Sequence, residues 1–432
     1  MALTFFWILA AFPLFGKALP PTTPRVGVSI PLSKRTPQLA VNGVVDRDFL
    51  NAQVVKVHNK LARGFAAYER NTGKAHPSNT KHITRRSTGA DALQDDSETL
   101  WQGTVEVGTP SVKFTVDFDT GSSDFFLPGP NCDSSCGGHT VYDTSSSSTA
   151  TDQNQRFSLA YGDGSTVEGD VFTDTFTIAG LKATKQAIGA ATTYSSGFSA
   201  DNFQPDGLVG MAFKEISDFG DDPLFQTLVS QGVTTSPEFA FELSTSGAEL
   251  FLGGVNQNKY TGSFTTSRVS STGFWQINMD SANIGGKAVV ESLSAIIDTG
   301  TTLIVGDTNT VSEFYDSISG SADASQTVGD GFFTGNLSIF LAIAFLNISL
   351  TFGGKAFSIS ANTFNLGQAE QGSSDCVGGI IGQDVGDAWI VGDVFLQNVY
   401  TCELSDPNPD ALANDIEAFN VEDETVGFAN LA

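Results

Sequence analysis

Two short segments of the chain place an aspartate in the same chemical setting. Asp119-Thr120-Gly121-Ser122-Ser123 and Asp298-Thr299-Gly300-Thr301-Thr302 lie 179 residues apart, and each directly follows an apolar run typical of a β-strand. Two carboxylates that a duplicated fold brings together can hold one proton between them, because two like charges at short range do not both form easily. We therefore predict that Asp119 and Asp298 form a catalytic acid–base pair.

A second repeated segment supports a duplicated half-site. Asp206-Gly207-Leu208-Val209-Gly210 follows the first aspartate, and Ala388-Trp389-Ile390-Val391-Gly392-Asp393 follows the second. Asp119 precedes Gly210 by 91 residues, and Asp298 precedes Gly392 by 94 residues. The alternative is that all four segments are ordinary strand-to-turn junctions, but the matched spacing favours two copies of one motif.

The composition predicts that β-strands position these segments. Charged residues make up 16% of the 432 residues, there are 45 glycines, and short runs of Val, Ile, Phe and Thr alternate with clusters of Gly, Asp and Ser. This pattern is typical of a mainly β protein, and the length allows two or three domains with a large core. The clearest helical stretch is Pro223–Gln231, where the proline is compatible with a first helical position.

The charge divides the chain into two unequal parts. Residues 19–86 contain 12 Lys and Arg against 3 Asp and Glu, whereas residues 87–432 contain 9 against 45. The resulting net charges of +9 and −36 predict that the basic segment is held against the acidic body by electrostatic attraction. The alternative is a solvated or nucleic-acid-binding tail, but the dibasic Arg85-Arg86 at the end of the segment favours a propeptide.

The start of the chain is predicted to be a signal peptide. Leu3–Phe15 is apolar but too short to span a bilayer, and Gly16-Lys17-Ala18 offers a cleavage site, although no positive charge precedes the apolar run. We therefore expect a signal peptide over 1–18 and a propeptide over 19–86 in a secreted protein. Passage through an acidic vesicular compartment is left open.

The scarcity of histidine restricts the chemistry. Three of the four histidines, His58, His76 and His82, lie in the predicted propeptide, and only His139 remains in the body. A nucleophile with a histidine base, or a histidine-based zinc site, would depend on that one residue in the polar segment Gly137–Thr140. We expect carboxylates to perform the acid–base chemistry, and we expect neither a metal nor a cofactor.

Together these motifs resemble those of the pepsin-like aspartic endopeptidases, and in particular the secreted fungal enzymes of the polyporopepsin type. The resemblance covers Trp101 to the C-terminus. Besides the repeated segments, it rests on Val107-Gly108-Thr109-Pro110, Tyr161-Gly162-Asp163-Gly164-Ser165, Phe274-Trp275-Gln276 and Val426-Gly427-Phe428-Ala429. It implies a mainly β, bilobal, pepsin-like double β-barrel fold with pseudo-twofold symmetry and a deep central cleft. The expected lobes are 87–268, which includes the flap, and 269–432.

The resemblance also implies roles for the neighbours of the two aspartates. The threonine after each aspartate corresponds to one that crosses to the other loop, and the hydroxyl residue two positions further corresponds to an outer hydrogen-bond donor. The glycine between them lets the backbone approach the carboxylates, because no Cβ is in the way. The supporting residues implied are Thr120, Gly121, Ser122, Thr299, Gly300 and Thr301, with ordinary turn residues as the alternative.

A flap over the substrate is also implied. Two glycines at a hairpin tip supply both the turn and the mobility of a lid, and the residues implied in substrate binding are Tyr161, Gly162, Asp163 and Ser165. The alternative is a surface β-turn.

Two departures from pepsin bear on specificity. Phe126 stands where pepsin has a tryptophan that bonds the flap tyrosine, and Asp117 stands where many relatives are aliphatic. Related fungal enzymes with an acidic flap tip accept Lys at P1. We therefore expect large apolar P1 residues, and also Lys, to be preferred at an S1 subsite that Asp117 and Asp163 make acidic.

The four cysteines predict disulfide chemistry in a secreted chain. Cys132 and Cys136 resemble the small loop disulfide of the family, with a metal-binding pair as the alternative. Cys376 matches a cysteine that pairs with an upstream partner in relatives, but 335–347 contains no cysteine, so pairing with Cys402 stays open. Residues 335–345 and 402–417 depart from the family pattern, either as natural loops or as gene-model artefacts.

The resulting expectation is a monomeric acid endopeptidase, made as a zymogen, that hydrolyses internal peptide bonds of proteins and binds neither nucleic acid nor a membrane. A propeptide cation is expected near the two aspartates, with Arg70, Lys74 and Lys81 as candidates. Two alternatives are a glycosidase, which also uses two carboxylates but holds them farther apart, and a catalytically inactive pepsin-like binding protein.

Overall fold

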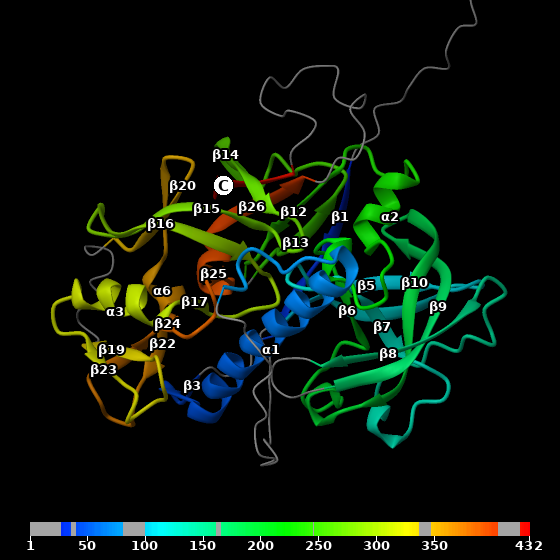
Figure 1. The fold of residues 1–432 in the computed structure, drawn as a ribbon, viewed down its shortest axis with the longest axis horizontal. Helices are drawn as coiled ribbons and strands as arrows, with labels where there is room; N and C mark the ends of the chain where they lie inside the picture. Colours follow the sequence, from blue (N-terminus) through cyan, green and yellow to red (C-terminus); the bar gives the residue numbers. More distant parts are fainter. Residues whose placement is uncertain are drawn as a thin grey trace, which may run out of the picture.

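The computed structural model describes residues 27–35, 40–80, 100–160, 166–244, 246–336, 347–404 and 424–432. Strands dominate, and those of the described residues form three sheets of 13, 8 and 6 strands. Figure 1 shows two β-rich halves, one built around β16, β20 and β24 and the other around β8, β9 and β10. The mainly β, bilobal architecture expected from the sequence is confirmed.

The strands of the preceding segment and of the first half are β1 (Val28–Pro31), β2 (Ser33–Arg35), β3 (Ala40–Val41), β4 (Val44–Val45), β5 (Leu100–Val107), β6 (Val112–Asp119), β7 (Phe125–Pro128), β8 (Thr151–Ala160), β9 (Thr166–Ile178), β10 (Leu181–Tyr194), β11 (Gly207–Gly210), β12 (Glu238–Glu242) and β13 (Glu249–Leu252). The strands that follow are β14 (Tyr260–Ser271), β15 (Gln276–Ile284), β16 (Lys287–Ile297), β17 (Ile304–Gly306), β18 (Ala322–Asp323), β19 (Phe333–Asn336), β20 (Ser349–Phe352), β21 (Lys355–Ser358), β22 (Asn365–Gln368), β23 (Asp375–Gly378), β24 (Ile380–Gly382), β25 (Ala388–Val391), β26 (Val399–Leu404) and β27 (Thr425–Leu431).

The two halves repeat one strand arrangement. In the first half the order β6-β11-β7-β10 has parallel, antiparallel and parallel pairings in turn, and in the second half β16-β25-β17-β24 has the same three pairings. Gly210 lies opposite Asp119 at the end of the first parallel pair, and Val391 lies opposite Ile297 in the second. The duplication expected from the motif spacing is therefore present in the topology.

The helices are α1 (Arg47–Thr72), α2 (Leu224–Ser230), α3 (Thr308–Asp316), α6 (Ala361–Phe364) and α7 (Asp393–Leu396), with short 3-10 turns at Ser134–Cys136, Ser196–Phe198 and Lys214–Ile216. The predicted helix at Pro223–Gln231 is confirmed as α2, with Pro223 at its N-cap position. No described helix is long and apolar enough to cross a membrane.

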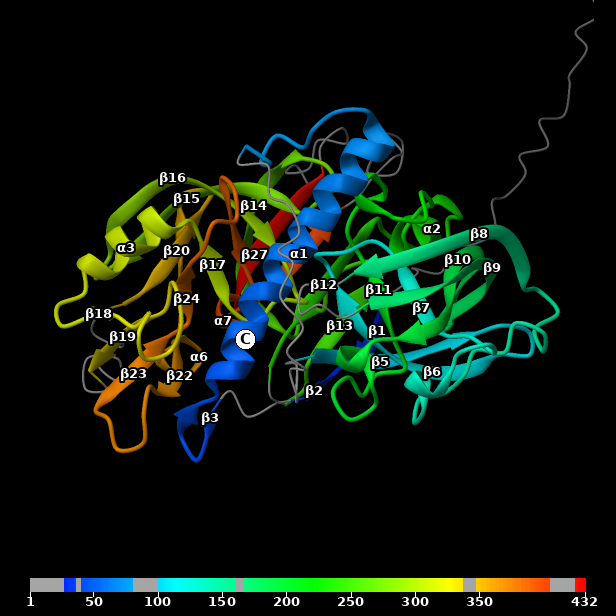
Figure 2. The same ribbon diagram turned by 60° about the horizontal axis from the view of Figure 1, so that its bottom comes forward.

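The longest helix, α1, was not predicted. Asp46 caps its first turn by accepting a hydrogen bond from Phe49 N at 3.0 Å, and Gly73 ends it in a left-handed conformation at φ 71°. In both views α1 lies across the middle of the molecule, between the two β-rich halves (Figures 1 and 2). Most of its side chains from Phe49 to Ala67 are buried, including charged ones, so the helix fills the space between the halves.

The two stretches that depart from the family pattern begin later than expected. Gly335 and Asn336 lie on β19, and 337–346 lie outside the described residues. Cys402 and Glu403 lie on β26, which pairs with β12 and β27, so the second departure begins after Leu404. Residues 405–423 lie outside the described residues.

Glu403 gives the fold a pH-dependent weakness. Its side chain is fully buried, neither carboxylate oxygen has a hydrogen-bond partner, and burial raises its pKa well above the ordinary value of 4.5. On β26 it lies opposite Phe239 of β12 and Val426 of β27. Because the folded-state pKa is raised, stability is lost as pH rises above 4.5.

We expect Glu403→Gln, which keeps the shape but cannot ionise, to melt higher than the wild type by a few degrees at pH 7. To fold at this pH the wild type must either bind a proton at Glu403 or bury an unpaired charge, and this costs about 1–3 kcal/mol. The difference is expected to shrink toward pH 5. Thermal unfolding of the wild type and the variant across this range measures the difference, and a difference that does not depend on pH would contradict the assignment.

Candidate active site

The two Asp-Thr-Gly loops meet through a symmetric set of hydrogen bonds. Thr120 N donates to Thr299 Oγ1 at 3.1 Å, and Thr299 N donates to Thr120 Oγ1 at 3.0 Å. Each hydroxyl then donates across to the other half, Thr120 Oγ1 to Ile297 O at 3.0 Å and Thr299 Oγ1 to Phe118 O at 2.8 Å. These bonds fix the ends of β6 and β16 against each other, so the strands that precede the aspartates determine where the carboxylates lie.

Each carboxylate accepts the same two bonds from its own loop. Gly121 N and Ser122 Oγ donate to Asp119 at 2.9 and 2.5 Å. In the second loop, Gly300 N and Thr301 Oγ1 donate to Asp298 at 2.9 and 2.6 Å.

The glycines are required by the close approach of the opposite carboxylate. A Cβ on Gly121 would lie 2.5 Å from Asp298 Cγ, and a Cβ on Gly300 would lie 2.3 Å from Asp119 Oδ1. Any side chain at either position would therefore push the two carboxylates apart.

A lysine of the preceding segment joins the two carboxylates. Lys60 Nζ, from α1, lies 2.9 Å from Asp119 Oδ1 and 3.0 Å from both Oδ1 and Oδ2 of Asp298. All three side chains are at most 3% exposed. A buried charge without a partner is costly, so the lysine and the two aspartates form one unit.

The two aspartates differ in protonation. Burial alone would raise the pKa of Asp119, but the Lys60 ammonium and the Ser122 hydroxyl hold it well below its ordinary value. Burial raises the pKa of Asp298, and the neighbouring charge of Asp119 adds to this against the effect of Lys60. Burial would lower the pKa of Lys60, yet the two carboxylates raise it overall. The arrangement thus favours an ionised Asp119 beside an Asp298 that takes up a proton more readily.

The candidate propeptide cations named from the sequence were wrong where the structure describes them. Arg70 Nη2 donates to Asp218 Oδ1 at 2.9 Å, and Lys74 lies exposed beyond the end of α1, while Lys81 lies outside the described residues. The reason is the straight helix: at about 1.5 Å per residue, Arg70 lies roughly 15 Å along the axis from Lys60.

The other predicted site residues fall into two groups. Tyr161, Gly162, Asp163 and Ser165 lie outside the described residues. Asp117 is 2% exposed and accepts a hydrogen bond from Trp101 N at 3.2 Å. Phe126 is buried and makes edge contacts with Tyr194 and Phe198 in a satellite core of the first half.

Sequence reasoning did not single out Asp393, a third buried aspartate whose pKa the charge of Asp298 influences. Trp101 Nε1 donates to both carboxylate oxygens of Asp393 at 3.0 Å, and Asp393 N donates to Thr301 O at 2.8 Å. Burial raises the pKa of Asp393 to about 8, against the effects of Trp101 and Lys34, and the charge of Asp298 adds to the shift. The position of Asp393 directly after the repeated apolar segment was the available signal.

The structure contains the small loop disulfide that the resemblance implied. Cys132 and Cys136 form a disulfide, whereas Cys376 and Cys402 are free and buried. Within the described ranges, no group of three or more His, Cys, Asp and Glu side chains is arranged to hold a metal ion.

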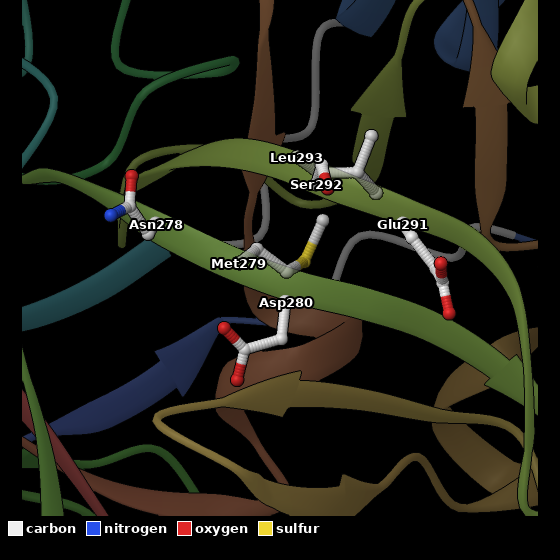
Figure 3. Close-up of a pocket in the computed structure, with 6 residues that line it drawn as sticks. All are labelled: Asn278, Met279, Asp280, Glu291, Ser292 and Leu293. Atoms are coloured by element: carbon white, nitrogen blue, oxygen red, sulfur yellow. The ribbon is translucent and has the colours of Figure 1, made fainter.

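A surface pocket of about 510 Å³ lies on the hairpin of β15 and β16 and is lined by Asn278, Met279, Asp280, Glu291, Ser292 and Leu293. Figure 3 shows that the carboxylates of Asp280 and Glu291 do not point toward one another. Asp280 Oδ2 accepts a hydrogen bond from Gly354 N at 2.7 Å. This pocket therefore lacks the paired carboxylates that make the Asp119–Asp298 site a candidate for catalysis.

Comparisons with known proteins agree on one family. Residues 101–408 match the family model described as eukaryotic aspartyl protease. Over 382 residues the chain is 41% identical to an aspartic protease of Phaffia rhodozyma, covering 87% of this chain and 88% of that protein. It is 36% identical to rhizopuspepsin-4 of Rhizopus niveus, with 73% and 77% covered, and 34% identical to pepsin A of Sus scrofa, with 72% and 80% covered.

Proposed function

We propose that Asp119 and Asp298 are the catalytic residues of this chain, which belongs to the eukaryotic aspartyl protease family and is an aspartic-type endopeptidase that acts on proteins. We further propose that the enzyme is secreted and is made as an acid-activated zymogen. The observation that carries the proposal is Lys60 of α1, which bonds both carboxylates at once. We propose the division 1–18 signal peptide, 19–86 propeptide, 87–268 and 269–432 lobes, and a monomer. Large apolar P1 residues, and Lys, are the proposed preference.

The position of the Lys60 ammonium indicates how the pair works once α1 has left. Its nitrogen lies within 3.0 Å of three carboxylate oxygens, so it stands in for the water molecule that attacks the peptide carbonyl. Asp119, whose carboxylate accepts hydrogen bonds from Gly121 N and Ser122 Oγ that favour its ionised form, takes a proton from that water as the general base. Asp298, which holds a proton more readily, donates to the carbonyl oxygen as it becomes negative. The pair then protonates the leaving amine, and no covalent intermediate forms.

The same contact accounts for latency. A substrate must reach the two carboxylates that Lys60 covers, and α1 is additionally fixed to both halves of the molecule. Asn51 Nδ2 donates to Val328 O at 3.1 Å in the second half, and Asn71 Nδ2 donates to Ser217 O at 2.8 Å in the first. The proposed propeptide is thus an intramolecular inhibitor that must detach before hydrolysis.

A direct test is to incubate the purified precursor with casein at pH 7 and at pH 4, with and without pepstatin. We expect no cleavage at pH 7, and at pH 4 a shorter chain whose cleavage of casein pepstatin blocks. Full activity of the intact precursor at pH 7 would contradict the proposed inhibition, and activity that pepstatin does not affect would contradict the proposed residues.

His76 is expected to contribute to acid release. Its ring is 2% exposed and packs against Phe65, Tyr68 and Phe274, with ring centroids 4.8 to 5.7 Å away. The groups facing it with polar atoms are the backbone of Ser78 and Thr272 and the Ser271 hydroxyl. Of all these only Tyr68 can ionise, and none of the ion pairs among the described residues involves His76.

Burial lowers the pKa of His76 from 6.5 to about 4, although a hydrogen bond to the backbone of Thr272 acts in the opposite direction and raises it. The docked segment therefore favours the neutral ring, while the released segment takes up a proton below pH 6.5. Docking is at full strength above pH 6.5 and weakens as pH falls toward 4.

His76→Gln and His76→Phe, which do not protonate in acid, are expected to lower the pH of half-maximal precursor processing by about half a unit to one unit. Phe65→Leu is the matched control: it loosens the same cluster without a titrating group, so it should speed processing by a similar factor at every pH. Processing followed by gel between pH 3 and pH 7 measures this. An unchanged midpoint in both His76 variants would contradict the role.

A further inference from the structure

The cations of α1 mark positions in the cleft that favour positive charge. Lys60 lies on the two catalytic carboxylates, so the helix occupies the place where a substrate must lie. Arg63, one turn further, is only 6% exposed although it carries a charge. Burial of a guanidinium requires a compensating partner, so the carboxylate that Arg63 meets identifies an acidic position beside the catalytic pair.

That carboxylate belongs to Asp218. Arg63 Nε lies 3.7 Å from Asp218 Oδ2, and Arg70 Nη2 lies 2.9 Å from Asp218 Oδ1. The Asp218 side chain is 15% exposed with both arginines in place. It therefore makes its charged contacts to the helix, which the proposed activation removes.

The turn that carries Asp218 is bonded to the body as well as to the helix. Asp124, five residues after the catalytic Asp119, accepts hydrogen bonds from Ser217 Oγ at 2.7 Å, Asp218 N at 2.9 Å and Phe219 N at 3.2 Å. Burial, followed by the charge of Asp218, raises the pKa of Asp124 to about 6. These bonds tie the Asp218 turn to the loop that carries Asp119, so Asp218 keeps its position when α1 leaves.

We infer that Asp218 is a specificity-determining residue that binds a Lys or Arg side chain of the substrate within three residues of the scissile bond. The spacing supports this, since the three residues from Lys60 to Arg63 advance about 4.5 Å along the helix, and an extended substrate advances about 3.3 Å per residue. The inference rests on the proposed function, because it requires α1 to vacate the cleft.

The test uses the activated enzyme and peptides that place Arg, or its uncharged analogue citrulline, at each position from P3 to P3′. We expect Arg to raise kcat/KM by roughly 10- to 100-fold at one of these positions, as expected for a hydrogen bond between charged groups. Asp218→Asn is expected to abolish that preference and to leave cleavage of the citrulline peptide within about twofold, because Asp218 does not touch the reacting atoms. Asp218→Arg should reverse the preference toward Glu at the same position.

Asp222→Asn is the matched control, because Asp222 lies near the same turn but pairs with Lys214 at 3.0 Å and is half-exposed. It should keep the Arg preference. If Asp218→Asn does not fold, the preference of the wild-type enzyme for Arg over citrulline is measured between 0.05 and 0.5 M salt. A charge contact predicts that this preference declines as salt is added, and a constant preference overturns the inference. Equal cleavage of Arg and citrulline peptides at every position also overturns it. Failure to cleave any peptide would instead contradict the proposed function.

Discussion

Replacing either Asp119 or Asp298 with Asn is expected to lower kcat for protein cleavage at acid pH by about 10⁴-fold or more, as for other residues that act as one catalytic unit. An amide at either position keeps the shape of the site but neither takes a proton from water nor shares one with its partner. Because each aspartate depends on the other, the double variant should be no less active than either single variant.

The measurement is casein or peptide hydrolysis by each purified variant at pH 4, with the mature chain prepared by adding a trace of wild-type enzyme and removing it afterwards. Asp280→Asn is the matched control, because this carboxylate lies on β15 of the second half and lines the surface pocket of Figure 3, whose lining includes neither Asp119 nor Asp298. It should retain wild-type activity. Retention of more than a tenth of the activity by Asp119→Asn or Asp298→Asn would refute the catalytic assignment.

No histidine or cysteine of the described residues is placed to replace an aspartate. His139 is bonded through Nε2 to Phe198 O at 2.9 Å, and His58 and His76 lie on the proposed propeptide. Cys376 and Cys402 are buried, and burial raises the pKa of both thiols. The loss of activity should therefore be nearly complete and should not be rescued at higher pH.

The sequence predicted that the two Asp-Thr-Gly loops meet, because the information for this is local and duplicated. Each Asp-Thr-Gly segment ends a strand, and the matched spacing to the second segments anticipated the parallel pairs β6–β11 and β16–β25. The crossed threonines and the outer donors then lie where the resemblance implied.

The sequence did not reveal α1, although its signals were present. Leu50, Val54, Val57, Leu61 and Phe65 repeat at helical spacing, with Asp46 as cap and Gly73 as stop. The adjacent stripe of Lys56, Lys60 and Arg63 is typical of a solvated helix face. Burial of Lys60 and Arg63 is favourable only because carboxylates of the body meet them, and no local pattern reports those partners. The same limit applies to His76, because one of its three aromatic neighbours, Phe274, lies far away in the sequence.

The second large effect is expected at Lys60. In the precursor, Lys60→Met keeps the length and apolar stem of the side chain but leaves two buried carboxylates without their cation. Breaking a buried ion pair on one side costs about 3–5 kcal/mol, which corresponds to roughly 10²- to 10³-fold in the docking equilibrium of α1. The variant is therefore expected to process itself at pH 6.5, where the wild-type precursor stays latent.

The pKa shifts define the pH range in which this effect is largest. The pKa of Asp119 is lowered, so its bond to Lys60 is at full strength above the ordinary value of 3.8 and is lost only as pH falls below it. The pKa of Asp298 is raised, so this carboxylate takes up a proton already above the ordinary value, which weakens its share of the contact. Wild-type and variant precursors should therefore differ most near neutral pH and converge as pH falls below 4.

Lys74→Met is the matched control for Lys60→Met, since it removes a lysine of the same segment that lies exposed beyond α1. It should remain latent at pH 6.5. Binding of labelled pepstatin to the precursor at pH 6.5 separates release of the helix from hydrolysis: the wild type and Lys74→Met should exclude the inhibitor, and Lys60→Met should bind it. If Lys60→Met excludes pepstatin as the wild type does, the remaining contacts of α1 suffice for inhibition, and the dyad–lysine contact is not its basis.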